Sequence, residues 1–173
     1  MNSNRLKMLT LLAVLSALLT VGRVSFQFIP NVQPNTAILI IASFVLGPTY
    51  GLVLAAISTI TSNLYLGSGI WTIGQIAAWG SIAVFSGLIG KRRTQLPHWA
   101  LTVYAGLCGY YFGIVMTLFN APYLDHLWAY YLAGLSFDTN HAVGNMLFYA
   151  VLAKPLFFIM NKQMHVKEKS GAA

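Results

Sequence analysis

Long apolar runs separated by short polar breaks occupy most of this 173-residue chain. A helix that crosses the hydrocarbon core of a bilayer needs about 20 mostly apolar residues, so there is room for about six such spans. Hydrophobic residues make up 57% of the chain and charged residues 8%, a balance that a water-soluble domain of this size could not solvate. We therefore expect an all-α integral membrane protein, a single domain over residues 1–173, with six transmembrane helices. The expected spans cover about residues 6–29, 37–46, 52–66, 73–90, 99–119 and 141–161.

The basic stretch at residues 91–98 fixes the expected orientation, because Lys and Arg beside membrane spans stay preferentially on the cytoplasmic side. Lys154 lies just inside the last run, where its aliphatic stem lets the ammonium reach the same interface. Of the 10 Lys and Arg residues, only Arg23 falls elsewhere. We therefore predict that both termini are cytoplasmic. The other basic residues flank the first and last runs: Arg5, Lys7, Lys162, Lys167 and Lys169.

Composition and motifs exclude several functions. The net charge of +7 comes from residues that flank apolar runs and form no stripe, which favours contact with the bilayer and excludes nucleic acid as a partner. The single Cys108 permits neither an intramolecular disulfide nor a cysteine metal site. Carboxylate pairs, activated nucleophiles, phosphate-binding loops and metal-ligand clusters are missing, so we expect no enzyme, no cofactor and no metal.

The first polar break offers candidate binding residues. Arg23 lies towards the outer end of the first span, where a buried charge is expensive unless it is paired, although snorkelling to the headgroups is an alternative. Asn31, Gln33 and Asn35 follow between two prolines. Their uncharged amides suit a neutral polar ligand, but Asn and Pro are equally common in ordinary turns.

The second outer break adds a glycine-rich segment and an amide. Asn63 sits near the end of the third span, and residues 67–72 follow it. Gln75 and Trp79 are four residues apart and therefore share one helix face, where an amide beside an indole can form a binding wall. For Trp71 and Trp79, a place in the interfacial aromatic belt is the competing interpretation.

Residues 120–140 form the longest stretch without a clean span, and we expect them to be an outer loop or cap. Asp138 or Thr139 would then cap the last helix, which begins at about His141. Asn145 shares the face of His141 and, at lipid depth, requires a hydrogen-bonding partner. His141 has no companion at metal-ligand spacing, so we interpret it as a wall residue.

Alternating six spans from a cytoplasmic N-terminus places the three polar breaks outside. The unusual polar and aromatic residues would then meet in one external cavity, as expected of a ligand-binding protein. The predicted substrate-binding residues are Arg23, Asn31, Gln33, Asn35, Asn63, Trp71, Gln75, Trp79, Asp138, His141 and Asn145.

The sequence resembles the substrate-binding S-components of energy-coupling factor (ECF) vitamin transporters, over most of its length, and the cobalamin-specific branch most. The pantothenate-specific branch is the alternative. The likeness is carried by the first-helix pair Ala13 and Ala17, the loop at 30–34, the segment 66–72 with Gln75, and the segment 137–145.

This resemblance implies partners and a mechanism. Two cytoplasmic ATPases and a transmembrane coupling protein would form the ECF module, and Ala13 and Ala17 would dock against the coupling protein. The loaded subunit would topple in the membrane of a bacterial cell and release its vitamin inward, while ATP is bound and hydrolysed by the partners.

Two questions stay open at this stage. Cobalamin is bulky, amide-rich and nearly neutral overall, which matches amides and aromatics around a wide cavity. Pantothenate is a small anion that needs a cation, which only Arg23, or a protonated His141 or His126, could supply on the outer side. A membrane scaffold whose outer loops bind a protein is the alternative from another class.

Overall fold

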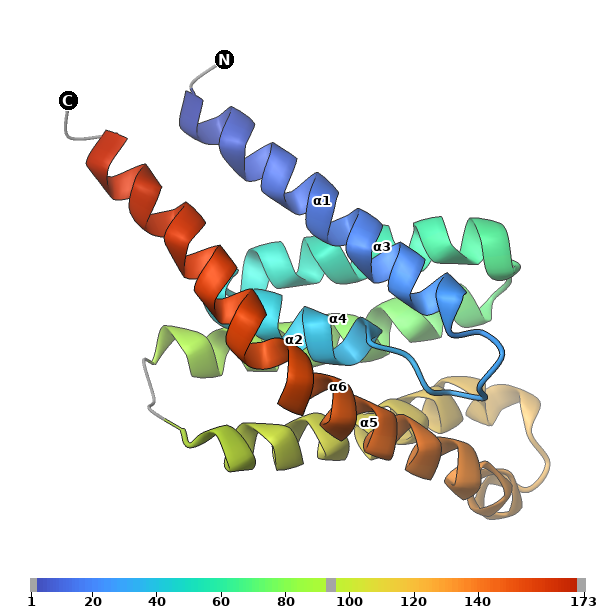
Figure 1. Ribbon diagram of the computed structural model, residues 1–173. Helices are drawn as coiled ribbons and strands as arrows, with labels where there is room; N and C mark the ends of the chain where they lie inside the picture. The colour runs from blue at the N-terminus through green and yellow to red at the C-terminus, as the bar shows by residue number, and fades with distance from the viewer. Residues whose placement is uncertain (1–2, 93–95, 171–173) are drawn as a thin grey trace.

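A computed structural model describes residues 3–92 and 96–170 of the chain, with side chains for 5–92 and 96–163. Throughout this part the regular structure is helical, which confirms the all-α prediction (Figure 1). Five of the helices are long and apolar enough to cross a membrane, and α2 is shorter. The elements in chain order are α1 Ser3–Ser25, α2 Asn35–Leu46, α3 Pro48–Leu66, α4 Trp71–Lys91, α5 His98–Asn120, the 3-10 turn Ala121–Tyr123, and α6 Leu127–Ser170.

Helix α2 lies at the centre of the molecule. It has 12 residues, and its first nine, Asn35 to Ser43, are all buried. At about 1.5 Å per residue it is too short to cross a hydrocarbon core of about 30 Å alone. Helices α3, α4 and α6 pack around it, and α1 and α5 also touch it. Its uniformly apolar middle is therefore protein core and not a lipid-facing surface.

A tight turn separates α2 from α3. Gly47 has φ of 86°, a backbone conformation that favours glycine, and its N–H donates to the Ser43 carbonyl at 2.8 Å. Pro48 then begins α3, where its missing N–H costs nothing. The sequence placed the end of one span at residue 46 and the start of the next at 52, whereas α3 already begins at Pro48, so Gly47 alone separates the two helices.

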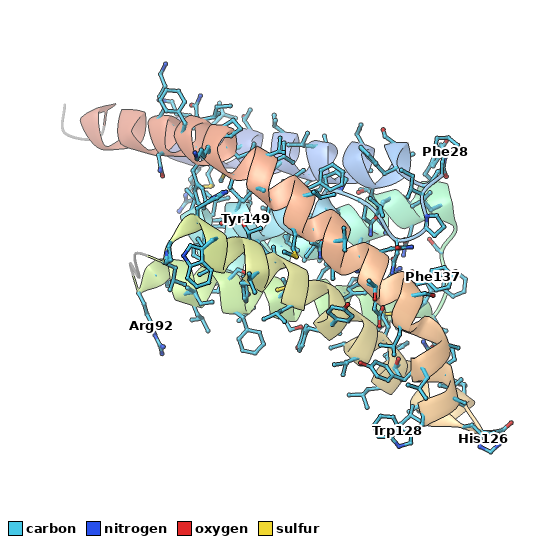
Figure 2. All side chains as sticks on the ribbon, turned by 60° about the horizontal axis from the view of Figure 1, so that its bottom comes forward. Phe28, Arg92, His126, Trp128, Phe137 and Tyr149 are labelled. Carbon is cyan, nitrogen blue, oxygen red and sulfur yellow. The ribbon has the colours of Figure 1, made fainter. Side chains whose placement is uncertain are left out.

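The two ends of the molecule differ in composition. Figure 1 shows the beginning of α1 and the end of α6 at one end of the molecule, with the end of α4 and the beginning of α5 on the same side. The α1–α2, α3–α4 and α5–α6 connections lie at the other end, which we call the polar-loop end. In Figure 2, Arg92 lies at the first end, and His126 and Trp128 lie at the polar-loop end. This arrangement agrees with the predicted alternation, and the side of the membrane that each end faces stays a prediction.

Residues 127–140, predicted to be a loop, are helical. Helix α6 begins at Leu127 and contains the predicted sixth span, 141–161, within its 44 residues. The polar and acidic residues lowered the apolar signal of this segment, but Gly134 is its only strong helix breaker. Asp138 and Thr139 therefore lie inside the helix and do not cap it, and the Thr139 hydroxyl donates to the Leu135 carbonyl at 2.8 Å.

The first predicted span was also too long at one end. Helix α1 ends at Ser25, not at about Ile29, and residues 26–34 form turns that lead into α2. Asn31 adopts φ of 62° in this connection, the only non-glycine residue of the described chain with positive φ. Asparagine tolerates this conformation better than most residues, so the turn depends on its identity.

Glycines permit close helix contacts at two places. In α5, a Cβ on Gly109 would meet the backbone of Ala142 in α6. In α4, a Cβ on Gly87 would meet the backbone of Gly47 and Pro48. Backbone atoms cannot rotate aside as a flexible side chain can, so these contacts fix the helix spacing.

We predict that Gly87→Ala lowers the free energy of unfolding by about 1–3 kcal/mol, because the added methyl group meets backbone of the α2–α3 turn. Gly134→Ala is the matched control, since a Cβ there has nothing within 4 Å, and it should stabilise helix α6 by up to about 1 kcal/mol. Thermal unfolding of both variants in the same detergent checks the pair, and equal unfolding midpoints would contradict the packing assignment.

Candidate functional site

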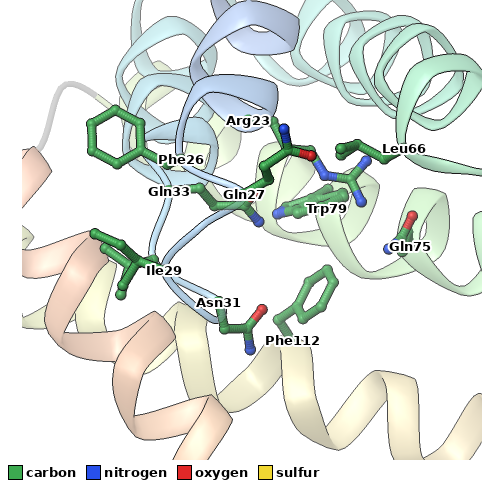
Figure 3. A pocket seen from close by; sticks show the side chains of 11 residues that line it. Arg23, Phe26, Gln27, Ile29, Asn31, Gln33, Leu66, Gln75, Trp79 and Phe112 are labelled. Carbon is green, nitrogen blue, oxygen red and sulfur yellow. The ribbon is translucent and has the colours of Figure 1, made fainter.

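A pocket of about 150 Å³ opens at the polar-loop end (Figure 3). It lies between the end of α1, the α1–α2 connection, the end of α3, and the facing sides of α4 and α5. Amides, aromatic rings and one guanidinium share the lining. The lining residues are Arg23, Phe26, Gln27, Ile29, Asn31, Val32, Gln33, Leu66, Gln75, Trp79 and Phe112.

Arg23 provides the only charged side chain of this lining. It is 8% exposed, and its Nη1 donates to Ser62 Oγ at 2.6 Å and to Asn63 Oδ1 at 2.7 Å. The guanidinium carbon lies 4.8 Å from the ring centroid of Trp79, within the range of a cation–π interaction. The side chain is therefore held against α3 and α4, and it does not snorkel away from the protein.

Asn63 connects three helices through its amide. Its Oδ1 accepts the bond from Arg23 of α1, while its Nδ2 donates to Thr72 Oγ1 and Gln75 Oε1 of α4, each at 2.8 Å. With 1% exposure, this amide is satisfied almost entirely by protein. The network orients both Arg23 and the pocket-lining Gln75.

Trp79 and Phe112 form the inner wall of the pocket, with ring centroids 4.6 Å apart. The Trp79 indole donates from Nε1 to Thr36 Oγ1 at 2.9 Å. Thr36 Oγ1 also lies 2.9 Å from His141 Nε2, and the tautomer of His141 decides which of the two groups donates. His141 is fully buried and packs edge-on against Phe112, which places it behind the inner wall.

Five of the eleven predicted binding residues line the pocket: Arg23, Asn31, Gln33, Gln75 and Trp79. Asn63 and His141 do not line it, but each contacts a residue that does.

The other four lie elsewhere. Asn35 is buried at the start of α2, and Trp71 is 45% exposed at the start of α4, beside Gly69. Asp138 faces Gly113 in the α5–α6 interface, and Asn145 is fully buried in α6. The structure therefore does not bring the whole predicted set to one cavity.

Several lining residues were missed by sequence reasoning. Phe26, Gln27 and Ile29 were assigned to the first span, which placed them on a helix and not in the connection. Phe112 carried no signal because an aromatic residue inside a span is usually core or lipid contact. Ser62, which does not line the pocket but accepts a hydrogen bond from Arg23, carried a weak signal, since a hydroxyl residue beside Asn63 at lipid depth also requires a partner.

The α1–α2 connection is tied to helix α6 beside the pocket. Asn31 Nδ2 donates to the Phe137 carbonyl at 3.0 Å, and Val32 lies against Gly144. These contacts join the polar-loop end of α6 to the pocket rim.

Two buried asparagines differ in how their amides are satisfied. Asn63 makes three hydrogen bonds through its oxygen and nitrogen. Asn145 has no hydrogen-bond partner at either amide atom within the described chain, and His141 Nδ1 and Asn35 Oδ1 are also unpartnered there.

Ala13 and Ala17 are exposed on α1, whereas Leu12, Leu15 and Leu19 of the same helix are buried. The alanine pair is therefore available on the outer surface of the helix. Among the described residues, no group of three or more His, Cys, Asp or Glu side chains is placed to hold a metal ion.

Comparison with known proteins identifies one family. The family model described as "ECF transporter, substrate-specific component" matches residues 7–162, which is most of the chain. Neither the curated proteins nor the solved structures gave a match.

We predict opposite stability changes for the two asparagines. Asn63→Leu should lower the free energy of unfolding by about 1–3 kcal/mol, because it leaves a buried donor and acceptors without partners. Asn145→Leu should raise the unfolding midpoint, because it removes a buried amide that has no recorded partner. Thermal unfolding in detergent measures both. A similar loss of stability in the two variants would mean that the Asn145 amide is satisfied, for example by ordered water.

Proposed function

Because the chain belongs to the family of ECF transporter substrate-specific components, we propose that it captures a small organic solute in the pocket at the polar-loop end. Members of this family are substrate-binding components of transporters, generally without catalytic activity, and they work with an ECF module of membrane and ATPase subunits. In this proposal the solute enters from outside the cell and is delivered inward while the partner subunits hydrolyse ATP.

The observation that carries the proposal is the mixed lining of the pocket. Ligand sites combine apolar walls with a few placed polar groups that fix orientation. Here Trp79 and Phe112 supply the wall, while Arg23, Gln75 and the amides of the α1–α2 connection supply the polar groups. The Asn63 network holds two of these polar groups in place without a ligand.

The size of the pocket supports a small vitamin over cobalamin. Pockets for drug-sized ligands measure about 300–1,000 Å³, and cobalamin is larger than such ligands. The 150 Å³ pocket would have to open widely to admit it. Pantothenate, the alternative from the sequence, is much smaller and carries a carboxylate. We therefore favour pantothenate or another small vitamin, and we keep cobalamin as the competing substrate.

The proposed location is the plasma membrane of a bacterial cell, with both termini in the cytoplasm. Support comes from the basic residues at the termini and in the α4–α5 connection, which border apolar helices. The polar-loop end would then face outward.

We further propose that the exposed Ala13 and Ala17 dock against the membrane subunit of the ECF module. Small residues four apart let another helix approach closely in a bilayer. Their exposure on α1, next to a buried leucine face, supports this assignment.

Calorimetric titration of the purified chain in detergent tests the substrate. We expect saturable binding of pantothenate or another small vitamin, and no binding of cyanocobalamin. Saturable cyanocobalamin binding would establish the competing substrate. If no vitamin bound to the chain alone or to its complex with the ECF module, the ligand-binding proposal would fail in favour of a membrane scaffold.

Ala13→Trp should abolish vitamin uptake in cells while leaving ligand binding to the purified chain intact, because bulk at this position blocks docking and not the pocket. Leu107→Trp is the matched control, since Leu107 is 61% exposed on α5 and the substitution adds the same ring elsewhere on the surface. Uptake assays and calorimetry measure the two effects. Normal uptake by the Ala13 variant would show that the docking assignment is wrong.

A further inference from the structure

We infer that the captured solute carries a carboxylate, which binds the guanidinium of Arg23. This inference rests on the proposed function and adds the chemical class of the substrate. Three observations support it: the burial of Arg23, the directions of the hydrogen bonds that Arg23 donates, and the charge of the pocket lining.

Arg23 is a buried cation without a protein counter-charge. Within the described chain it makes no ion pair, and its hydrogen bonds go to the neutral oxygens of Ser62 and Asn63. Burying an unpaired charge is costly, so such residues inside a membrane are normally paired or functional. A ligand anion would supply the missing counter-charge.

The hydrogen bonds of Arg23 leave one edge of its guanidinium, formed by Nε and Nη2, free to bind a carboxylate. Both hydrogen bonds of the Arg23 guanidinium leave from Nη1. The Nε and Nη2 hydrogens, which lie along one edge of the planar group, have no acceptor among the described residues. Two parallel N–H donors match the two oxygens of a carboxylate.

The position of this edge is fixed before a ligand arrives. The guanidinium lies over Trp79, which is itself held by Thr36, and the Asn63 oxygen is held through Thr72 and Gln75. A preorganised donor pair loses little conformational entropy on binding, which raises affinity.

The rest of the lining favours a single negative charge on an otherwise neutral solute. The pocket contains no acidic side chain and no second cation. One cation balances a carboxylate, whereas a phosphate group near neutral pH carries up to two charges. The amides of Gln27, Asn31 and Gln33 can bond to the neutral polar part of the solute, and Phe112 can cover its apolar part.

The test compares three carboxylates with their neutral counterparts: pantothenate with panthenol, biotin with biotinamide, and nicotinate with nicotinamide. Each is titrated calorimetrically into the wild-type chain, alongside cyanocobalamin. We expect at least one carboxylate to bind, and its neutral counterpart to bind about 100-fold more weakly, as expected when a charge-assisted bidentate pair is lost.

Variants of Arg23 locate the effect. Arg23→Gln should weaken binding of that carboxylate by about 100-fold, and Arg23→Lys, which keeps the charge but not the two-donor edge, by about 10-fold. Arg5→Gln removes a cation from the other end of the same helix and should leave binding unchanged.

Asn63→Asp offers an independent test, because it places a carboxylate where Asn63 Oδ1 accepts the bond from Arg23 at 2.7 Å. This internal partner should compete with the ligand, so the variant should lose carboxylate binding, while Thr72 and Gln75, which accept from Asn63 Nδ2 in the wild type, must turn their donors toward the new carboxylate. Asn140→Asp, at an exposed position of α6, is the control.

The outcomes separate the inference from the proposed function. Binding of a carboxylate that survives Arg23→Gln or Asn63→Asp, or equal binding of its neutral counterpart, would overturn the inference and leave the binding function standing. Cyanocobalamin binding that survives Arg23→Gln would also overturn the inference and leave the binding function standing. Absence of binding by every probe would instead contradict the proposed function, and the inference with it.

Discussion

The enclosure of the short helix α2 is the constraint on which the rest of the structure depends. This helix cannot cross a bilayer by itself, and its neighbours bury all of its first nine residues. The long helices therefore serve two purposes, since they face the surroundings and also form the shell of an apolar core. The turn at Gly47 and Pro48 holds one end of α2, and the α1–α2 connection holds the other.

The beginning of α2 links this core to the pocket. Thr36, in its first turn, bonds to Trp79 of α4 and lies within hydrogen-bonding distance of His141 of α6. The inner wall of the pocket thus contacts a helix that is packed between its neighbours. Above it, Arg23 and Asn63 join α1, α3 and α4. A pocket built this way presents fixed donors, and the open edge of Arg23 is the one that a carboxylate fits best.

The sequence predicted the helical class and most helix boundaries, because apolar runs and the Pro and Gly breaks between them are strong local signals. It did not predict the helix at 127–140. Polar and acidic residues lower the apolar content of this segment, but its Tyr, Leu and Ala residues are compatible with a helix whether or not lipid surrounds them.

The candidate site was predictable only in part. Alternating spans correctly brought Arg23, Gln75 and the α1–α2 connection to one end, because topology alone determines which loops meet. The rotation of each helix about its axis depends on tertiary packing, which a single sequence does not reveal. For this reason Asp138 faces Gly113 and not the pocket, and Phe112 lines the pocket although the sequence did not predict it.

The central claim is that a pocket open to the outside of the cell holds the solute. Gln33→Cys tests it directly, because Gln33 lines the pocket and the native Cys108 is buried. Intact cells are treated with a membrane-impermeant maleimide, with and without a saturating concentration of the bound vitamin. We predict that the maleimide labels the Gln33→Cys variant in intact cells, and that the bound vitamin prevents this labelling. Labelling only in inside-out vesicles, or labelling that the vitamin does not reduce, would contradict the account.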